Sequence, residues 1–252
     1  QAIAVAQSFA GRIQSAAINN QTINPQEMVD LETSILNTNE NISSIWYSPK
    51  YGEKLTPPKD EFSAKINWYD KDGIFHPFIS KSNGKIVIAP GSLYDEKLSW
   101  IKGPKEDKKT FITKPYIWKV AGKDQLLLSI AVPMYQDGEF IGSAGIDYNL
   151  EVISKLTSSI KLYENGYAFI TDSNGIILGH PEKDLQNKNL LEVENNDSDY
   201  KKMLENSKNL KEYQFFKKSH TKSIESTYYS FPFSLHNTNS KWTFVVTAPI
   251  DE

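Results

Sequence analysis

The chain contains one pattern twice, first as Ser82-Asn83-Gly84-Lys85-Ile86-Val87-Ile88-Ala89-Pro90 and again as Ser173-Asn174-Gly175-Ile176-Ile177-Leu178-Gly179-His180-Pro181. In both copies an Asn-Gly turn leads into a short apolar strand that ends at a proline. A run of strands follows each copy and closes on Gly145-Ile146-Asp147 in one and on Ala248-Pro249-Ile250-Asp251 in the other. Asn-Gly turns before strands also arise by coincidence, but the shared order of elements favours two related α+β modules in tandem.

Two helices are predicted ahead of the first copy. Apolar residues recur every three to four positions from Ala2 to about Ile18, which is the spacing of an amphipathic helix. Asn24-Pro25-Gln26-Glu27 then supplies an N-cap, a proline at the first helical position and a capping-box glutamate, so a second helix follows. We expect the inner face of this second helix to carry Met28, Leu31, Ile35 and Leu36.

Short β-rich runs separated by turn sequences fill the rest of the chain and predict an α+β fold. In the first half the predicted strands are Ile42–Tyr47, Phe62–Tyr69, Ile74–Ser80, Lys85–Ala89, Phe111–Trp118, Gln125–Tyr135 and Glu139–Asp147. Residues 91–110 are predicted to be helical or loop-like, with an interruption at Gly103-Pro104. The second half is predicted to hold a helix over Asn149–Leu162, strands at Tyr167–Asp172 and Ile176–Leu178, a helix near Ser198–Asn206 and three strands that end with Trp242–Pro249.

Composition excludes several classes of protein. The 252 residues include 30 aromatic residues (12 Phe, 13 Tyr and 5 Trp), too many for a disordered tail, and no cysteine, which excludes a disulfide scaffold and thiolate zinc sites. A net charge of −3 argues against a nucleic-acid binder, which would carry a basic excess. No apolar run reaches the roughly 18 residues of a membrane span. Because the chain opens in mid-helix pattern without methionine, we expect it to be part of a longer protein.

Motifs of catalysis are not found, and we expect neither enzymatic activity nor a cofactor. There is no nucleophile elbow, Walker loop or dinucleotide fingerprint, and the four histidines do not have the spacing of metal ligands. The carboxylates of Glu61, Asp70 and Asp72 cluster near a turn, where we expect solvation rather than calcium binding. The small residues Gly142-Ser143-Ala144-Gly145 lie within a predicted strand, where they allow a ligand or a neighbouring backbone to approach closely.

One part of the first module combines aromatic and charged residues in the manner of a ligand site. Aromatic side chains offer flat walls with a polar edge, and a lysine with an aspartate can pair with both charges of a small zwitterion. The candidate residues are Tyr94, Lys97, Trp100, Tyr116, Trp118 and Asp147. Asp147 ends an apolar strand, so it could instead serve as the N-cap of the following helix, and the two roles are compatible.

These residues lie in segments that resemble the double Cache (dCache) sensor domains, the extracytoplasmic ligand-binding modules of bacterial chemoreceptors, sensor histidine kinases and cyclic-dinucleotide enzymes. The resemblance rests on Pro115-Tyr116, on Ile130-Ala131-Val132-Pro133-Met134-Tyr135, and on Gly138 through Asp147 followed by Leu150. In the second module it rests on Asn165-Gly166-Tyr167-Ala168-Phe169-Ile170, Ser173-Asn174-Gly175-Ile176-Ile177 and His180-Pro181. It implies a long N-terminal helix followed by two tandem PAS-like modules, each a central antiparallel sheet with flanking helices.

The resemblance divides the chain into an N-terminal helical stalk (1–40), a membrane-distal ligand-binding module (41–155) and a membrane-proximal module (156–252). Members that bind amino acids carry a site that Trp100, Tyr116 and Asp147 match in this chain. In those members an arginine two residues before the tryptophan and an aromatic residue after it complete the site. Here Leu98 and Ile101 occupy those positions, so Lys97 is the substitute cation and Tyr94 the candidate for a further tyrosine.

The resemblance implies a non-enzymatic sensor of a small molecule, with an amino acid or a small carboxylate as the expected ligand and an amine or an uncharged metabolite as alternatives. The parent would be a membrane-anchored, homodimeric receptor with a transmembrane helix on each side of this periplasmic or extracellular part. A methyl-accepting chemotaxis protein is the preferred parent and a histidine kinase the next. Two other functions are considered for the chain. One is a module that senses through a partner protein, and the other is an extracytoplasmic hydrolase.

Overall fold

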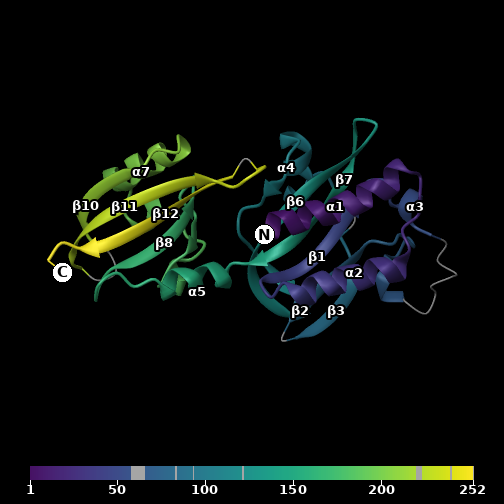
Figure 1. The fold of residues 1–252 in the computed structure, drawn as a ribbon, viewed down its shortest axis with the longest axis horizontal. Helices are drawn as coiled ribbons and strands as arrows, with labels where there is room; N and C mark the ends of the chain where they lie inside the picture. Colours follow the sequence, from purple (N-terminus) through teal and green to yellow (C-terminus); the bar gives the residue numbers. More distant parts are fainter. Residues whose placement is uncertain are drawn as a thin grey trace. The chain divides into compact units, whose positions relative to one another are not determined.

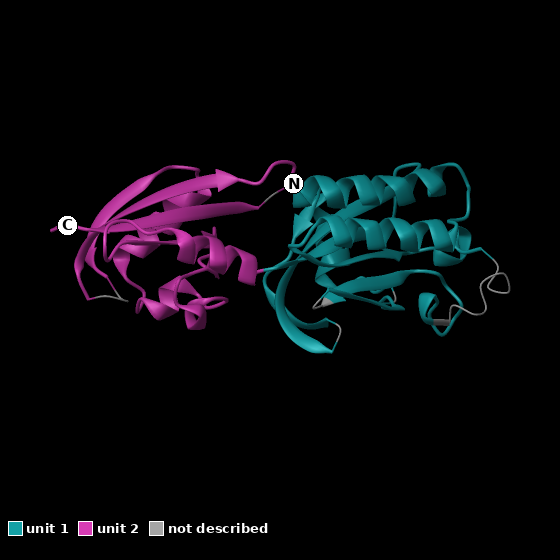
Figure 2. Ribbon diagram, turned by 60° about the horizontal axis from the view of Figure 1, so that its bottom comes forward, with its two compact units in different colours: residues 1–149 teal, residues 150–252 magenta. Residues whose placement is uncertain are grey.

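The computed structural model describes residues 1–57, 66–82, 84–92, 94–120, 122–219, 223–238 and 240–251. The chain forms two compact units, residues 1–149 and 150–252 (Figure 2). Each unit holds one antiparallel sheet with helices packed against it, so the predicted α+β class is confirmed. The boundary at residue 155 that was expected from the sequence lies inside helix α5 (Glu151–Ser159), and the N-terminal helices belong to the first unit.

Unit 1 is built around a seven-stranded sheet of order β3-β2-β1-β7-β6-β4, with β5 paired to β6 (Figure 1). Its strands are β1 (Ile42–Pro49), β2 (Pro77–Ser82), β3 (Lys85–Pro90), β4 (Phe111–Ile112), β5 (Tyr116–Val120), β6 (Lys123–Gln136) and β7 (Glu139–Asn149). Its helical elements are α1 (Ala2–Ile18), α2 (Pro25–Thr38), α3 (Gly52–Leu55), the short 3₁₀ helix η2 (Ile66–Trp68) and α4 (Ser99–Asp107).

The two N-terminal helices pack against the sheet, α1 over β6 and β7 and α2 over β1 and β2. Helix α1 has the predicted limits and buries Phe9 and Ile13. Helix α2 begins where its cap predicted, because the side chain of Asn24 accepts hydrogen bonds from the backbone N–H groups of Gln26 and Glu27.

The inner face of α2 differs from the prediction. Leu31 is 37% exposed and Ile35 is only half-buried. The residues that face the sheet are Met28, Glu32 and Leu36, which recur every four positions along one side of the helix. A carboxyl group therefore lies in the core between two apolar side chains.

Two expectations around the first hairpin are corrected. Residues 62–65 of the strand predicted at Phe62–Tyr69 lie outside the described residues, as does Glu61, and 66–68 form η2. The turn after Asp70 forms, with its Oδ1 accepting from the N–H groups of Asp72 and Ile74. Asp70 was expected to be solvated, yet it is buried. Its Oδ2 lies 2.9 Å from Nε2 of His76, which is also buried, so the carboxylate has a partner inside the fold. Asp72 is exposed as predicted.

The strand predicted over Phe111–Trp118 is two strands, β4 and β5, separated by Thr113-Lys114-Pro115. Both pair with β6, Phe111 opposite Ala131 and Tyr116 opposite Leu127. Strands β6 and β7 form a long hairpin whose turn residues, Asp137 and Gly138, both have positive φ. This is the backbone of a type I′ turn, which matches the twist of the strands.

Unit 2 has a five-stranded sheet of order β10-β11-β12-β8-β9. Its strands are β8 (Tyr167–Asp172), β9 (Ile177–Gly179), β10 (Tyr213–Lys218), β11 (Glu225–Ser234) and β12 (Lys241–Pro249), and its other helical elements are η3 (Lys183–Leu185), α6 (Leu190–Val193) and α7 (Ser198–Lys208). Helix α5 is shorter than the predicted Asn149–Leu162. An aromatic core forms where Tyr200 of α7 packs against Phe215 and Tyr228 of the sheet, and Phe169 belongs to the same core.

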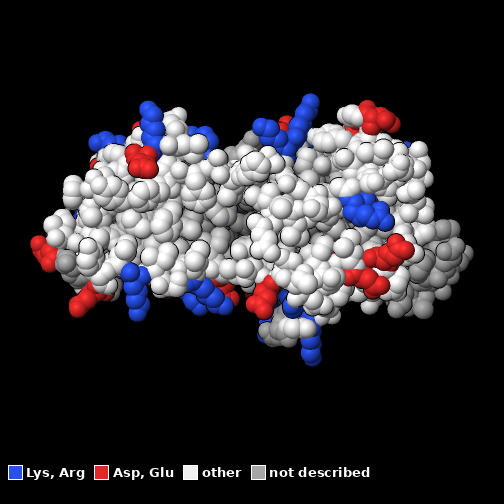
Figure 3. Space-filling model, in the orientation of Figure 1, with Lys and Arg blue, Asp and Glu red and all other residues white. Residues whose placement is uncertain are grey.

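Surface charge is mixed in sign. On the face that Figure 3 shows, basic and acidic side chains of the described residues are scattered, and no broad patch of either sign forms there. Within the described residues, no helix is both long enough and apolar enough to cross a bilayer.

Candidate functional site

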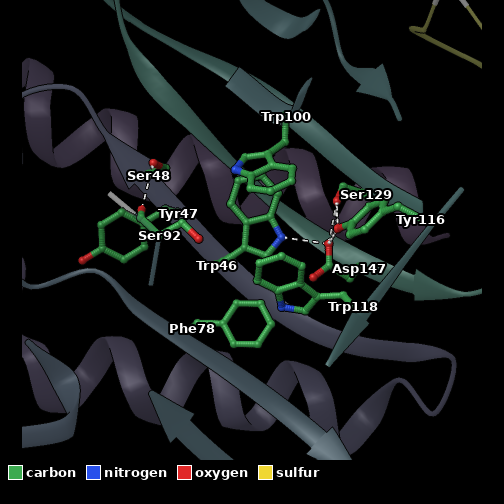
Figure 4. Close-up of a pocket in the computed structure, with 10 residues that line it drawn as sticks. All are labelled: Trp46, Tyr47, Ser48, Phe78, Ser92, Trp100, Tyr116, Trp118, Ser129 and Asp147. Carbon is green, nitrogen blue, oxygen red and sulfur yellow. Dashed lines mark hydrogen bonds between the residues drawn. The ribbon is translucent and has the colours of Figure 1, made fainter. Parts of the chain in front are cut away.

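A cavity in unit 1 is partly open to solvent, and it holds about 360 Å³ of space between atoms when the open solvent at its mouth is included (Figure 4). On strand β1 the ring of Tyr47 contacts Phe9 of helix α1. Because side chains alternate between the two faces of a strand, the neighbouring Trp46 points to the opposite face of the sheet. The lining residues are Trp46, Tyr47 and Ser48 from β1, Phe78 from β2, Ser92 from the following loop, Trp100 from α4, Tyr116 and Trp118 from β5, Ser129 from β6 and Asp147 from β7.

Asp147 is the centre of the polar end of the cavity, and it is 2% exposed. Its Oδ2 accepts from the hydroxyl of Ser44 at 2.6 Å, and its Oδ1 accepts from the indole N–H of Trp46 at 3.0 Å and the hydroxyl of Ser129 at 2.7 Å. The hydroxyl of Tyr116 lies 3.3 Å from Oδ1 and 2.6 Å from Ser129. The alternative role of Asp147 as a helix cap is wrong, because Leu150 occupies the N-cap position of α5.

Burial and hydrogen bonding act on Asp147 in opposite directions. Burial is the larger effect and raises the pKa of the carboxyl, while the hydrogen bonds from Ser44, Ser129, Trp46 and Tyr116 favour the ionised form. Burial, and next the nearby charge of Asp147, raise the pKa of Tyr116, which therefore stays a neutral donor. The carboxylate is thus held in place but poorly solvated, and a positive charge beside it would offset part of the cost of its burial.

Aromatic rings form most of the remaining wall. The ring of Trp100 lies 6.3 Å from that of Trp46, 6.0 Å from Tyr116 and 6.2 Å from Trp118, measured between ring centroids. Trp118 is 40% exposed. The residues that line the cavity therefore carry three indole groups, two phenols and a phenyl ring together with one carboxylate.

Of the six candidate residues, Trp100, Tyr116, Trp118 and Asp147 line this cavity, whereas Tyr94 and Lys97 do not. The hydroxyl of Tyr94 donates to Glu96, and its ring contacts Phe140. Lys97 is exposed. The two departures noted in the sequence are a half-buried Leu98 and a fully buried Ile101, and neither lines the cavity.

Three partners of Asp147 were missed in the sequence, namely Ser44, Trp46 and Ser129. Ser44 and Ser129 lie directly opposite Asp147 on the two neighbouring strands. Trp46 lies opposite Gly145, where an added Cβ would lie 3.0 Å from the indole ring. The same added Cβ would lie 2.3 Å from the backbone carbonyl oxygen of Ile130, so the expected close approach of a neighbouring backbone is found at Gly145.

Helix α4 places Trp100, and it runs through Gly103-Pro104, which was expected to interrupt it. Pro104 has no N–H to donate to the carbonyl of Trp100 four residues earlier. The hydroxyl of Ser143 on β7 donates to that carbonyl instead, at 2.7 Å. Gly103 packs against the ring of Phe111, where a Cβ would clash. Because Pro104 does not donate to it, the carbonyl of Trp100 is available to accept a hydrogen bond from β7, and this bond links helix α4 to the sheet.

Ser143→Ala is expected to lower the free energy of unfolding of unit 1 by about 1–2 kcal/mol, since it leaves a carbonyl without a donor. It should also loosen Trp100 and weaken ligand binding. Urea titration followed by tryptophan fluorescence measures the first effect. Ser99→Ala, at the exposed start of the same helix, is the matched control. Equal stability of the two variants would show that the hydroxyl does not hold the helix.

Unit 2 contains a smaller cavity, with about 260 Å³ of space when open solvent is included, lined mainly by apolar and aromatic side chains of its core. Its one carboxylate, Glu194, lies 3.6 Å from Nζ of Lys217, which also pairs with Asp197 at 2.7 Å. No group of three or more histidine, aspartate or glutamate side chains that could hold a metal ion is found within the described ranges. The cavity of unit 1 is therefore the stronger candidate site.

Comparison with known proteins identifies the family. The Cache domain family dCache_1 matches residues 1–252. The chain belongs to this family. The resemblance seen in the sequence is thus confirmed, and with it the assignment to a family of non-enzymatic sensor domains.

Among curated proteins, the chain is 36% identical over 101 residues to the methyl-accepting chemotaxis protein PscA of Pseudomonas syringae pv. tomato, covering 40% of this chain and 16% of that one. It is 32% identical over 121 residues to the methyl-accepting chemotaxis protein PctB of Pseudomonas aeruginosa, covering 46% of this chain and 19% of that one. The matches to curated relatives span between 14% and 20% of those proteins' own lengths.

Solved structures confirm the fold. The extracellular domain of the putative histidine kinase mmHK1S-Z3 matches with a TM-score of 0.80 at 22% identity, covering 99% of this chain and 87% of that one. The ligand-binding domain of Pseudomonas aeruginosa PctB in complex with L-Arg matches with a TM-score of 0.62 at 18% identity, covering 99% and 86%. The predicted arrangement, a long N-terminal helix followed by two units with antiparallel sheets, is the one these sensor domains have.

Proposed function

We propose that unit 1 is the ligand-binding part of a sensor and that its cavity binds a small molecule through a positively charged group placed beside Asp147. The observation that carries this proposal is a buried carboxylate at the end of a cavity walled by aromatic rings. A cavity with mainly apolar walls and a few convergent polar groups is the usual form of a small-molecule site.

The sign of the ligand's charge follows from the lining residues. Asp147 is the only charged side chain among the described residues that line the cavity. A cation would make the occupied cavity neutral, whereas an anion would place a second negative charge close to Asp147 in a partly desolvated site. Among the ligands expected from the sequence, an amino acid and an amine each carry an ammonium group that can pair with Asp147. A simple carboxylate has no such group, so the lining residues do not favour it.

The role of the whole protein is proposed from its relatives. The curated relatives are methyl-accepting chemotaxis proteins, and one of the solved structures holds L-Arg and another, the chemoreceptor CtaA of Pseudomonas fluorescens, holds L-leucine. We assign the chain to the periplasmic or extracellular part of a membrane-anchored, homodimeric receptor. A chemoreceptor is the first candidate, and a histidine kinase is the second because of the fold match to mmHK1S-Z3.

The test is ligand-induced stabilisation measured at two pH values. Small cations such as ethanolamine and choline should raise the melting temperature of the unit 1 transition, and acetate and propionate should not. Burial raises the pKa of Asp147. Below that pKa the carboxyl of the empty cavity is protonated, so affinity for a cation should fall by up to tenfold for each further unit by which the pH is lowered. Stabilisation by anions, or an affinity for cations that is the same above and below the raised pKa of Asp147, would contradict the proposal.

A further inference from the structure

We infer that the buried pair of Asp70 and His76 positions one rim of the unit 1 cavity and thereby sets its affinity for the ligand, an inference that rests on the function proposed above. The rim consists of Phe78, on β2, and Ser92, in the loop after β3. Neither member of the pair is among the described residues that line the cavity, so both would act on the ligand through the rim.

The carboxylate of Asp70 uses both of its oxygens inside the fold. Its Oδ1 accepts from the backbone N–H groups of Asp72 and Ile74, and its Oδ2 lies 2.9 Å from Nε2 of His76. Burial alone would raise the pKa of Asp70, but these hydrogen bonds outweigh it and lower the pKa below its ordinary value. An ionised carboxylate only accepts, so Nε2 of the imidazole is the donor. Asp70 thus fixes which ring nitrogen carries the proton.

The imidazole of His76 packs directly against the chain that leads to the rim. The backbone carbonyl of His76 accepts from the N–H of Gly91 at 2.9 Å. A Cβ added at Gly91 would lie 2.5 Å from that carbonyl oxygen and 2.8 Å from Nδ1 of the ring. Gly91 immediately precedes Ser92, and His76 stands two residues before Phe78. The pair therefore supports both of the segments that carry the rim.

The other side of the rim is held less firmly. The carbonyl of Ser92 accepts from the hydroxyl of Ser48 on β1, and at 3.4 Å this is a long hydrogen bond (Figure 4). Ser92 itself is exposed. Its position therefore depends mainly on the support that the imidazole gives at Gly91.

The proton on the ring decides whether this packing is satisfied. With the proton on Nε2, Nδ1 has only a lone pair, and it is buried without a hydrogen-bond partner among the described residues. A proton on Nδ1 would place an N–H group against Gly91 with no acceptor, and an unpaired buried donor is costly. The chain at Gly91 must then move or admit water, and Ser92 moves with it. The geometry of the rim is therefore linked to the protonation of His76.

Asp70 is the only charged side chain within hydrogen-bonding distance of the imidazole among the residues that the structure describes. Of the other titratable side chains on the adjoining strand and turn, the tyrosines are neutral below about pH 9 and the charged ones are exposed. These side chains are Tyr47, Tyr69, Lys71 and Asp72. Between pH 5 and pH 8 the proton on the ring is therefore the change that the rim experiences from this side.

Titration calorimetry of the full chain with ethanolamine tests the inference. At pH 8, His76→Ala and Asp70→Asn should each weaken binding by about tenfold, as expected if the rim is correctly placed in about one molecule in ten. In Asp70→Asn the amide oxygen can still accept from the turn, but the amide N–H then faces Nε2, which moves the ring proton to Nδ1. His76→Gln places an amide N–H where Nε2 lies, so it should retain the affinity of the parent within about threefold.

Two further variants separate the rim from general stability. Gly91→Ala leaves the pair intact and displaces the rim directly, so it should also weaken ethanolamine binding by about tenfold. Ile79→Val is the matched control, because Ile79 is fully buried on the same strand and is not among the described lining residues. It should lower the melting temperature of unit 1 and leave the affinity unchanged.

The pH profile is a readout that a merely structural role would not change. Imidazole side chains bind a proton at mildly acidic pH. Between pH 8 and pH 5 the parent should therefore lose affinity through both the ring and Asp147, whereas His76→Gln should lose it through Asp147 alone. We expect the loss in the parent to be larger by about tenfold.

The outcomes separate this inference from the proposed function. Absence of ethanolamine binding to the unchanged chain would overturn the proposed function and this inference with it. If the unchanged chain binds ethanolamine through Asp147, but the variants of the pair and of Gly91 bind it equally well, the inference alone is wrong. An equal loss of affinity in Ile79→Val would also overturn it, because affinity would then follow the stability of the strand. The same pH profile in the parent and in His76→Gln would refute the link to the ring proton.

Discussion

Asp147→Asn is expected to weaken binding of a cationic ligand by about 100-fold or more, because it removes the only charge that the described residues contribute to the cavity. Asparagine has the shape of aspartate, so the strand and the walls of the cavity should persist. Titration calorimetry gives the affinity, and near-ultraviolet circular dichroism verifies that the tryptophan environment is retained. The expected loss of about 3 kcal/mol or more reflects the removal of a desolvated charge pair.

Asp147→Ala adds a structural effect to the loss of charge. The indole N–H of Trp46 and the hydroxyls of Ser44 and Ser129 would lose their shared acceptor. Hydroxyl groups can turn to other partners, but the indole N–H is fixed by its ring, so unit 1 should lose about 1–3 kcal/mol of stability. Asp137→Asn, in the β6–β7 turn, is a control for charge removal at the surface. Undiminished ligand affinity in Asp147→Asn would refute the assignment of Asp147.

Elements whose cause is local could be predicted from the sequence. The limits of α1 follow from the spacing of its apolar residues, and the start of α2 follows from Asn24 and Pro25. Strand β8 has the limits that its apolar run predicted. In these segments the residues that decide the structure are neighbours in the chain, so a short window contains them all.

The parts that could not be predicted depend on contacts between distant segments. Ser44 and Trp46 meet Asp147 across more than 100 positions of sequence, and only the register of β1 against β7 brings them together. Helix α4 continues through Pro104 because β7 supplies a hydroxyl to the carbonyl that the proline leaves without a donor. Neither the register nor the donor has a signal in the local pattern.

Glu32 departs most clearly from the hydrophobic pattern, because it is a charged residue type on the buried face of α2. Its burial leads to the second prediction with a large effect, on stability. Its side chain is fully buried, and within the described part of the chain neither of its oxygens has a hydrogen-bond partner. Burial raises its pKa well above the ordinary value of 4.5. The hydroxyl of Tyr47 donates to the carbonyl of Phe75, and burial, and next the charge of Glu32, raise the pKa of that hydroxyl.

The raised pKa fixes the direction of the pH dependence. Below about pH 4.5 both the folded and the unfolded chain carry a proton on Glu32, so the group costs little. As pH rises above 4.5 the unfolded chain releases this proton while the folded chain keeps it, so the free energy of unfolding falls by up to about 1.4 kcal/mol per pH unit. The fall ends at the raised pKa of the folded state.

Glu32→Leu is therefore expected to stabilise unit 1 at pH 8 by about 2–4 kcal/mol, since it replaces an unpaired buried carboxyl by an apolar side chain of similar size. Glu32→Gln should remove the pH-dependent part of the effect and keep a polar group in the core. Urea unfolding at pH 5 and pH 8 measures both, with fluorescence reporting mainly on unit 1, which holds four of the five tryptophans. Glu27→Gln, exposed on the same helix, is the control. A Glu32→Leu variant that is no more stable than the parent at pH 8 would show that the carboxyl is compensated in the folded state, and the cost assigned to it would then be wrong.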